Sequence, residues 1–230
     1  FSQPHGGGGP GGGPLAVRDR PEPFLPVPAV VRDENRFRLD YDRPKSIGKV
    51  RAFTGPFGVF VRSYAFILAW GRELRTMSED SVLNANYLLA RLKDAYDLPF
   101  DRLCMHEFVL SARKLKREHG ITALDVAKRL MDYGFHPPTI YFPLIVPEAL
   151  MVEPTETETK ETLDAFADAM LAIAREAAEA PDEIKAAPHG RPVGRLDEVK
   201  AAKRAVVRYR FEDHPDLSGG MSYLDSDRHA

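Results

Sequence analysis

The chain has 230 residues, 43% of them hydrophobic and 29% charged, which is the composition of a globular protein large enough to bury a core. Its 32 basic and 34 acidic residues give a net charge of −2, so we expect no nucleic-acid partner. The single cysteine, Cys104, cannot form an internal disulfide, and the sequence has no CxxC pair that could hold zinc. We therefore expect no metal and a reducing, cytoplasmic location.

The longest apolar run, residues 58–71, is interrupted by Arg62 and is too short to span a bilayer. No membrane partner is therefore expected, and no signal peptide is expected before the glycine-rich start. Position 1 is not methionine, so the chain is interpreted either as processed or as a piece of something longer.

Four zones are predicted along the chain. Residues 1–17 are rich in glycine and proline. Residues 18–48 are expected to be loop-like, and the alternating prolines of PEPFLPVPAVV, which block helices and central strands, predict that this stretch runs extended over a surface. Residues 49–180 form the compact part, and residues 181–230 are polar and end in HPDLSGGMSYLDSDRHA, which is expected to be a loose tail.

The compact part is predicted to begin with two helices and a strand. Residues 56–77 indicate a mostly buried helix, because apolar side chains leave little room for a polar face. Residues 77–96 indicate a second helix, with Ser78 as its N-cap. Residues 103–112 indicate a strand, in which Cys104 and His106 would point to the same face.

A third helix follows, within residues 121–138, and its ends are clearly marked. Thr122 and Asp125 resemble a capping box, and Gly134 occupies the C-terminal stop. The apolar stripe is expected to consist of Leu124, Ala127, Leu130 and Met131.

Two short extended runs are predicted in residues 139–155, where Pro143 and Pro147 interrupt them. Thr155 and Glu158 then resemble a second capping box, which would open a last helix that ends before Pro181. Its apolar face would carry Leu163, Phe166, Ala167, Met170 and Ala174. The predicted helices alternate only loosely with strands that are few and widely spaced. This pattern predicts an α/β chain with an α+β small domain, and it argues against a complete doubly wound sheet.

The stretch FSQPHGGGGPGGGP places seven glycines between residues 6 and 13. Gly6, Gly8 and Gly11 satisfy GxGxxG, but such a match is nearly automatic in a glycine run. The fingerprint also needs a preceding strand and a following helix, so we predict neither a dinucleotide site nor a P-loop. Two interpretations stay open: a backbone that passes close to a bulky group, and a disordered linker.

The segment EPTETETKE could supply a pair of carboxylates for acid and base catalysis. Acids in the first turn of a helix are equally well explained by capping and by the helix dipole, and we favour that interpretation. The four residues concerned are Glu153, Glu156, Glu158 and Glu161.

The remaining candidates carry weak signals. His136, in GFHPP, lies in a predicted turn and is interpreted as structural. Cys104 and His106 are too sparse for a thiol catalyst or a metal site. Residues 114–120, KLKREHG, are interpreted as a solvated helix end.

Four stretches together resemble, in order, the C-terminal half of the glycine decarboxylase P-protein family of the glycine cleavage system. They are FSQPHGGGGPGGGP, SVLNANYLLARL, LMDYGFHPPTIYFPLIVPEALMVEPTETETKE and RLDEVKAAKRAVVRY. The stretch YFPLIVPEALMVEPTETE is similar to the sequence of the second subunit of the two-subunit bacterial form.

The resemblance implies the C-terminal part of a fold-type I enzyme that uses pyridoxal 5′-phosphate. The family's Schiff-base lysine would precede Phe1, so no catalytic role is assigned to a residue of this sequence. The glycine run would then lie beside the pyridoxal ring, where a Cβ could obstruct the cofactor or the entry path of the substrate arm. The implied cofactor-binding residues are Ser2, His5, Gly6, Gly7, Gly8 and Gly9.

The family's layout implies three parts. Residues 1–48 would finish the large cofactor domain and connect it to the next, residues 49–180 would form the small C-terminal domain, and residues 181–230 would be a polar extension and tail. A chain without the lysine is expected to bind pyridoxal phosphate only non-covalently, if at all, and to be inactive alone.

The implied reaction decarboxylates glycine and passes the aminomethyl group to the lipoyl arm of the H-protein. The implied partners are that lipoylated protein and a companion P-protein subunit, within an oligomer. An alternative stays open: a non-catalytic scaffold or interaction subunit that kept the small domain. Retention of seven glycines beside a missing cofactor argues against the scaffold.

Overall fold

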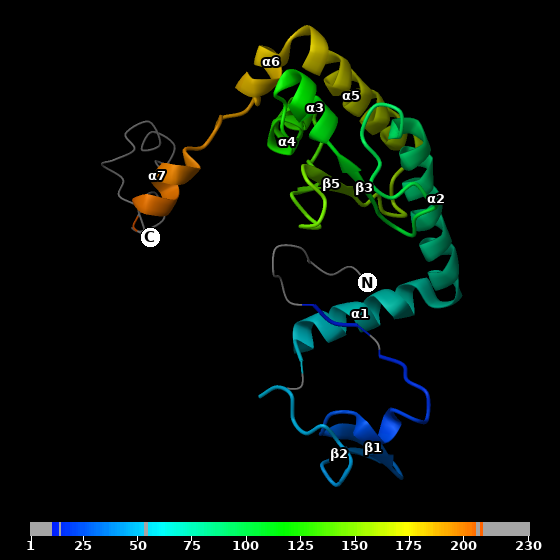
Figure 1. Cartoon of the computed structure of the whole chain (residues 1–230). Helices are drawn as coiled ribbons and strands as arrows, with labels where there is room; N and C mark the ends of the chain where they lie inside the picture. Colours follow the sequence, from blue (N-terminus) through cyan, green and yellow to red (C-terminus); the bar gives the residue numbers. More distant parts are fainter. Residues whose placement is uncertain (1–10, 14, 53–54, 206–207, 209–230) are drawn as a thin grey trace, which may run out of the picture. The chain divides into compact units, whose positions relative to one another are not determined.

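The computed structural model describes residues 11–13, 15–52, 55–205 and 208 (Figure 1). The chain divides into two compact units, residues 1–78 and residues 79–230, which are described separately. No helix in the described ranges combines the length and the apolar character needed to cross a bilayer.

The first unit contains a short antiparallel hairpin. A 3-10 helix, η1 (Glu22–Phe24), precedes strands β1 (Ala29–Asp33) and β2 (Arg36–Asp40), which pair from Ala29↔Asp40 to Asp33↔Arg36. The prediction that residues 18–48 are loop-like was therefore incomplete. The four alternating prolines precede β1 and Pro44 follows β2, which leaves the backbone N–H groups of both strands free to pair.

Helix α1 (Phe57–Trp70) confirms the first predicted helix, but the prediction that it is mostly buried is wrong for the described residues. Among them, Val59 alone is buried in this helix, whereas Phe57 is 79% exposed, Tyr64 64% and Leu68 63%. The cause is that apolar side chains surround the helix while the described part of its unit covers little of it.

The second predicted helix begins earlier than expected. A 3-10 turn, η2 (Gly71–Glu73), leads into α2 (Leu74–Leu92), so Ser78 lies inside the helix and is not its N-cap. The Ser78 hydroxyl donates to the carbonyl of Leu74 at 3.1 Å, a bond that serine makes within helices.

The second unit is built on a three-stranded antiparallel sheet of order β3–β5–β4. Its strands are β3 (Phe108–Ser111), β4 (Thr139–Ile140) and β5 (Ala149–Val152). The central strand pairs Leu150 with Leu110 on one side and with Ile140 on the other. This arrangement confirms the prediction of a small sheet with two short runs after the third helix.

Helices cover this sheet and complete the core (Figure 1). They are α3 (Arg113–His119), α4 (Ala123–Asp132), α5 (Lys160–Glu179) and α6 (Pro181–Ala186). A last helix, α7 (Glu198–Lys203), contributes no residue to this core. The core combines α2, α5 and the strands, as the buried side chains Leu88, Leu110, Leu150 and Met170 show.

The capping box of α4 is confirmed. The Thr122 hydroxyl accepts from the N–H of Asp125 at 3.2 Å, and the Asp125 carboxylate accepts from the N–H of Thr122 at 2.8 Å. Gly134 ends this segment with a φ of +86°, which glycine adopts without strain. The buried stripe is rotated from the predicted one, because Val126 is buried while Leu124 and Met131 are only half-buried.

The second predicted capping box is wrong. Helix α5 begins at Lys160, and its N-cap is Thr159, whose hydroxyl accepts from the N–H of Thr162 at 3.2 Å. Thr155 and Glu158 instead close a turn, in which the N–H of Glu158 donates to the carbonyl of Thr155 at 3.3 Å. The sequence offers one Thr-x-x-Glu choice, at Thr155, and one Thr-x-x-Thr choice, at Thr159, and the path of the chain out of β5 selects the later one.

Ordered packing continues beyond residue 180. Ile184 of α6 and Ala187 are fully buried, so the polar extension begins with packed structure. The predicted loose tail, residues 214–230, lies outside the described residues. Arg195 fixes the following turn, since its Nε donates to the carbonyl of Ala187 at 2.5 Å and its Nη1 lies 2.8 Å from the Asp125 carboxylate. The predicted domain boundaries at residues 48 and 180 stay a prediction.

Candidate functional site

The predicted cofactor-binding residues lie outside the part of the chain that the structure describes. Their role therefore stays a prediction. They are Ser2, His5, Gly6, Gly7, Gly8 and Gly9.

The second unit contains a cavity of about 360 Å³ between α2, the turn before β4, the end of β5 and the start of α5. Its floor is apolar, with the buried side chains of Leu88 and Leu163. Phe135 and Phe166 contribute an edge-to-face pair with ring centroids 5.4 Å apart. Its rim carries the exposed residues Thr139, His136, Glu153, Glu158 and Thr162.

Two stretches that the sequence singled out therefore meet in space, GFHPP and EPTETETKE. The four glutamates of the second stretch separate into different environments. Glu153 and Glu158 line the cavity. Glu161 lies in the first turn of α5, where a hydrogen bond from its own backbone N–H and one from Thr159 lower the pKa of its carboxyl. The capping interpretation thus holds for Glu161 and not for the two cavity residues.

The LNANY stretch of α2 holds the walls of this region in place. The Asn84 side chain donates to the carbonyl of Thr155 at 2.9 Å, which fixes the turn that precedes α5. The Tyr87 hydroxyl donates to the Asp164 carboxylate on α5, and Arg91 lies 2.8 Å from Asp168 one turn further along. Neighbouring positions of one helix thus contact both the turn and the helix that border the cavity.

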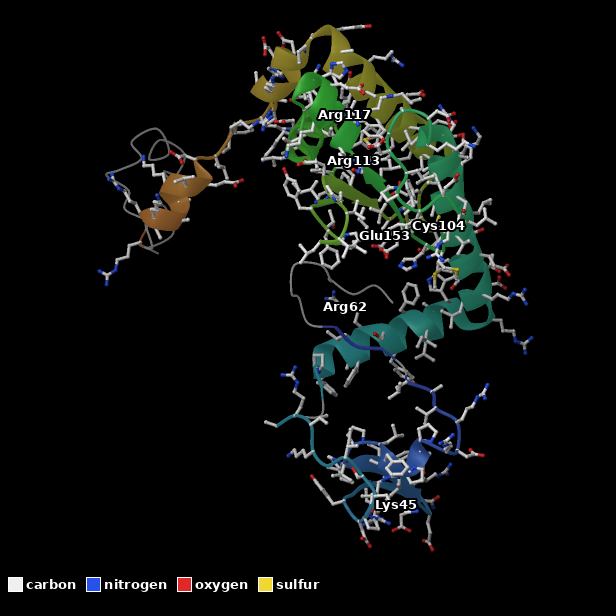
Figure 2. The ribbon with its side chains drawn as sticks, in the orientation of Figure 1. Lys45, Arg62, Cys104, Arg113, Arg117 and Glu153 are labelled. Carbon is white, nitrogen blue, oxygen red and sulfur yellow. The ribbon has the colours of Figure 1, made fainter. Side chains whose placement is uncertain are left out.

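Asn86 fixes the segment before β3. Its side-chain amide donates to the carbonyl of Cys104 at 2.9 Å and accepts from the N–H of Cys104 at 3.1 Å. The backbone of Cys104 is therefore paired with a side chain and not with a neighbouring strand. The prediction that Cys104 and His106 share a strand face is wrong, because both residues precede β3. His106 lies instead 3.9 Å from Glu153, with Nε2 nearest to Oε1. Burial raises the pKa of the Cys104 thiol. Figure 2 labels Cys104 and Glu153.

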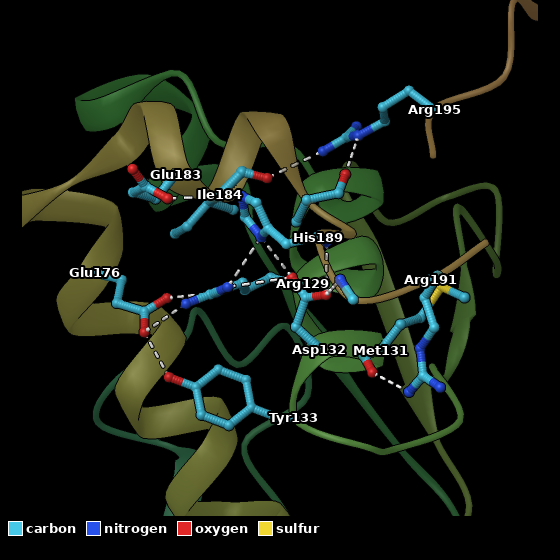
Figure 3. Close-up of polar contacts among 12 residues, drawn as sticks. Arg129, Met131, Asp132, Tyr133, Glu176, Glu183, Ile184, His189, Arg191 and Arg195 are labelled. Carbon is cyan, nitrogen blue, oxygen red and sulfur yellow. Dashed lines mark hydrogen bonds and ion pairs between the residues drawn. The ribbon is translucent and has the colours of Figure 1, made fainter. Parts of the chain in front are cut away.

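A second polar cluster joins α4, α5 and the segment after α6 (Figure 3). Arg129 lies 2.9 Å from Glu176 on α5 and 3.1 Å from Asp132 on its own helix. Asp132 also accepts from the backbone N–H of His189 at 2.7 Å and from that of Gly190 at 3.3 Å. These contacts anchor the chain that follows α6. Local sequence patterns contain no sign of them, because Asp132 and His189 are 57 residues apart.

The contacts of Asp132 predict how the free energy of unfolding changes at acidic pH. Burial by itself raises the pKa of this carboxyl, but the hydrogen bonds from His189, Gly190 and Arg129 outweigh it and lower the pKa from 3.8 to about 2. A lowered pKa in the folded state stabilises the protein above pH 3.8, and that stabilisation is lost as the pH falls toward 2. It amounts to about 2 kcal/mol.

We therefore expect the free energy of unfolding of Asp132→Asn to lie closest to that of the unaltered chain at pH 2 and to fall below it as the pH rises to 5. Urea unfolding at several pH values measures this difference. Asp101→Asn, at an exposed position, is the control and should follow the unaltered chain. A constant difference for Asp132→Asn between pH 2 and pH 5 would contradict the assignment.

The described cavities do not fit pyridoxal phosphate. A phosphate needs cationic or N–H donors, and the Schiff base needs a lysine, but neither lysine nor arginine lines the first cavity. A second cavity, of about 390 Å³, contains Arg113, whose guanidinium lies 3.5 Å from the Asp97 carboxylate. Within the described ranges there is also no cluster of three potential metal ligands.

Sequence reasoning missed several residues that build this region. Glu148 is one, because its carboxylate accepts from the N–H of Ala123 at 2.8 Å at the start of α4 and pairs with Lys116. Asn86 and Leu88 belong to the stretch SVLNANYLLARL, but no role was predicted for either residue. Their positions in a helix do not show that Asn86 contacts a distant loop and that Leu88 lines a cavity.

The comparisons with known proteins agree with this architecture. The family model described as "Glycine dehydrogenase, C-terminal domain" matches residues 77–189. The chain is 60% identical over 210 residues to the probable glycine dehydrogenase (decarboxylating) subunit 2 of Caldanaerobacter subterraneus and 57% identical over 210 residues to that of Halalkalibacterium halodurans. Each match covers 91% of this chain and 43% of the relative, so the chain spans less than half the length of these relatives.

A solved structure shows the fold. The chain matches a crystal structure of glycine decarboxylase (P-protein) of the glycine cleavage system, in inhibitor-bound form, with a TM-score of 0.52 and 24% identity. The match covers 69% of this chain and 38% of that one. It confirms the predicted fold class, a mixed helix-and-sheet small domain. Along 91% of its length the chain thus resembles the C-terminal part of glycine dehydrogenase (decarboxylating) subunit 2.

Proposed function

We propose that the chain serves as the C-terminal segment of a glycine dehydrogenase (decarboxylating), which releases CO₂ from glycine and transfers the aminomethyl group to the lipoyl arm of an H-protein. The observation that carries this proposal is the identity of 57% to 60% with subunit 2 of such enzymes along 91% of the chain. The name of these relatives, subunit 2, supports a companion subunit and an oligomeric enzyme.

The described residues support a structural contribution to that enzyme. The LNANY stretch fixes both the turn before α5 and the segment before β3, so these two segments have a defined position without help from a ligand. Preorganised segments of this kind present their side chains at a fixed place, which is what a domain bordering an active site requires.

Pyridoxal phosphate belongs to this proposal as the cofactor of the complete enzyme. The cavity rim at Glu153 and Glu158 has no cation for a phosphate, so the cofactor would have to be held elsewhere. The predicted place is the glycine run, with Ser2 and His5, together with a lysine outside this sequence. The 230-residue chain alone is expected to be inactive.

A chimaera tests the function. The corresponding C-terminal part of the Caldanaerobacter subunit 2 is replaced by this chain, and the protein is assembled with its companion subunit, pyridoxal phosphate and lipoylated H-protein. We expect exchange of labelled bicarbonate into glycine at a rate comparable to that of the unaltered relative, because 60% identity over the exchanged part preserves the packing.

Two controls make the result interpretable. The relative without its C-terminal part, and this chain alone, should both lack exchange. Circular dichroism and size-exclusion chromatography show whether the chimaera folds and assembles. A chimaera that assembles as the relative does and yet has no exchange would contradict the proposal and favour a non-catalytic scaffold.

A further inference from the structure

The described part of the first unit has almost no core. Among its described residues, Val59 is the single buried one. The second unit, in contrast, buries a cluster of apolar side chains between its sheet and its helices. Elements that hide so little apolar surface do not offset the conformational entropy that folding costs. The helix and the hairpin of the first unit therefore need to be covered.

Helix α1 shows which surface needs covering. Large apolar side chains recur along it at spacings of three and four residues, so they form one continuous stripe. The opposite side is apolar as well, with Val59, Phe66 and Trp70, and Arg62 is the only charged residue of the helix. A helix that is apolar on all sides is normally buried within a large protein. The exposed members of the stripe are Phe57, Phe60, Val61, Tyr64, Ile67 and Leu68.

The β1–β2 hairpin has the same need. A two-stranded sheet by itself is only marginally stable in water, and it normally gains a third strand or packs against another element. Within the described ranges this sheet has two strands. Val30 and Leu39 are paired opposite each other in it and are both exposed, as is Phe37. Both elements of the unit thus lack the packing that such elements require.

Three occupants could cover this surface: a second copy of the chain, a separate companion subunit, or more of the same polypeptide. A second copy would present an equally uncovered unit, and a separate subunit docks most readily on a surface that is already folded. The third occupant has the length required, since the matches cover 43% of the relatives and leave more than half of each one outside. A segment of that length is enough for a domain with its own core.

We propose that α1 and the hairpin dock into the part of a subunit 2 polypeptide that lies outside the matched segment, and complete the core of a domain there. This inference rests on the function proposed above, because it treats the chain as the C-terminal segment of such a polypeptide. It also moves the expected domain boundary. Helix α1 belongs with residues 1–48, and the small domain begins near α2 and not at residue 49.

Hydrogen–deuterium exchange of backbone amides, read by mass spectrometry of peptides, tests the docking. In this chain alone, the amides of α1 should exchange at least about tenfold faster than those of α5, because a helix of 14 residues is marginal without tertiary packing. In the chimaera, prepared without the companion subunit, exchange in α1 should slow at least about tenfold, since the rest of the polypeptide covers it. Exchange in α5 should stay the same.

Each other occupant gives a different result. Protection of α1 in the chain alone that rises with concentration would identify a second copy, and protection independent of concentration would identify another segment of this chain. Protection that appears in the chimaera only after the companion subunit is added would identify that subunit. Any of these results would overturn the proposal. The unaltered Caldanaerobacter subunit 2, compared with its own isolated C-terminal part, gives the same test if the chimaera does not fold.

A substitution locates the contact on the stripe. Leu68→Asp should leave the urea midpoint of the chain alone unchanged, but raise the exchange rate of α1 in the chimaera at least about tenfold, because the charge would be buried there. Leu83→Asp is the matched control, because Leu83 is a leucine of α2 that is 66% exposed, compared with 63% for Leu68. It should leave the exchange of α1 as it is. Unchanged protection in the Leu68→Asp chimaera would contradict docking through this stripe.

The assay with labelled bicarbonate reports separately on the proposed function. A chimaera that is active while α1 stays unprotected would refute the docking and leave the function standing. A protected α1 without activity would do the reverse.

Discussion

Replacing Leu150 with alanine is expected to destabilise the second unit by about 2–5 kcal/mol, because the change removes a fully buried side chain and leaves a cavity. Leu150 lies on the central strand β5, opposite Leu110 on one side and Ile140 on the other. The surrounding strands are paired on both sides, so they cannot collapse easily into the space. Urea unfolding followed by circular dichroism measures the loss.

A leucine six residues away provides the matched control. Leu144 is 85% exposed in the turn between β4 and β5, so Leu144→Ala should change the free energy of unfolding by no more than about 0.5 kcal/mol. Equal losses for the two variants would mean that β5 is not the centre of the core.

Asn86→Ala is expected to destabilise the chain by about 1–3 kcal/mol. The change removes two hydrogen bonds to the backbone of Cys104 and one to the carbonyl of Val82, and it leaves the half-buried groups of Cys104 without partners. The segment before β3 should then open. Burial would no longer raise the pKa of the Cys104 thiol, so the thiolate fraction at pH 8 should increase.

Two measurements check this prediction. Urea unfolding gives the stability, and the rate of reaction of Cys104 with a disulfide reagent under native conditions gives the accessibility of the thiol. Asn84→Ala is the control: it removes one exposed hydrogen bond to Thr155 and should cost less than about 1 kcal/mol. It should leave the thiol rate unchanged. If Asn86→Ala leaves the thiol rate unchanged as well, Asn86 does not hold this segment.

Sequence reasoning was most accurate where the signal is local. The capping box of Thr122 and Asp125 was predicted correctly, because both hydrogen bonds join residues three apart. It failed where several equivalent local choices competed. Thr159 and not Thr155 caps α5, and α2 begins before Ser78, since the path of the chain between distant elements selects one among similar caps.

The cavity could not be predicted from the same patterns. His136 and Glu153 stand 17 positions apart and face one space only because β4 pairs with β5, and Asn84 contacts Thr155 across 71 residues. The exposure of α1 was missed for the same kind of reason: an apolar composition shows that a helix needs covering, but not what covers it.

The sequence by itself determined the resemblance to glycine dehydrogenase subunit 2, the mixed fold class and the ends of α4, because these depend on residue identity and short spacings. Only the tertiary structure decided that Glu153, Glu158 and His136 line one cavity. It also decided that the Asn86 side chain holds the backbone of Cys104, and that Asp132 anchors the chain after α6. These contacts join residues far apart in the chain, and their geometry depends on how the sheet and helices pack as a whole.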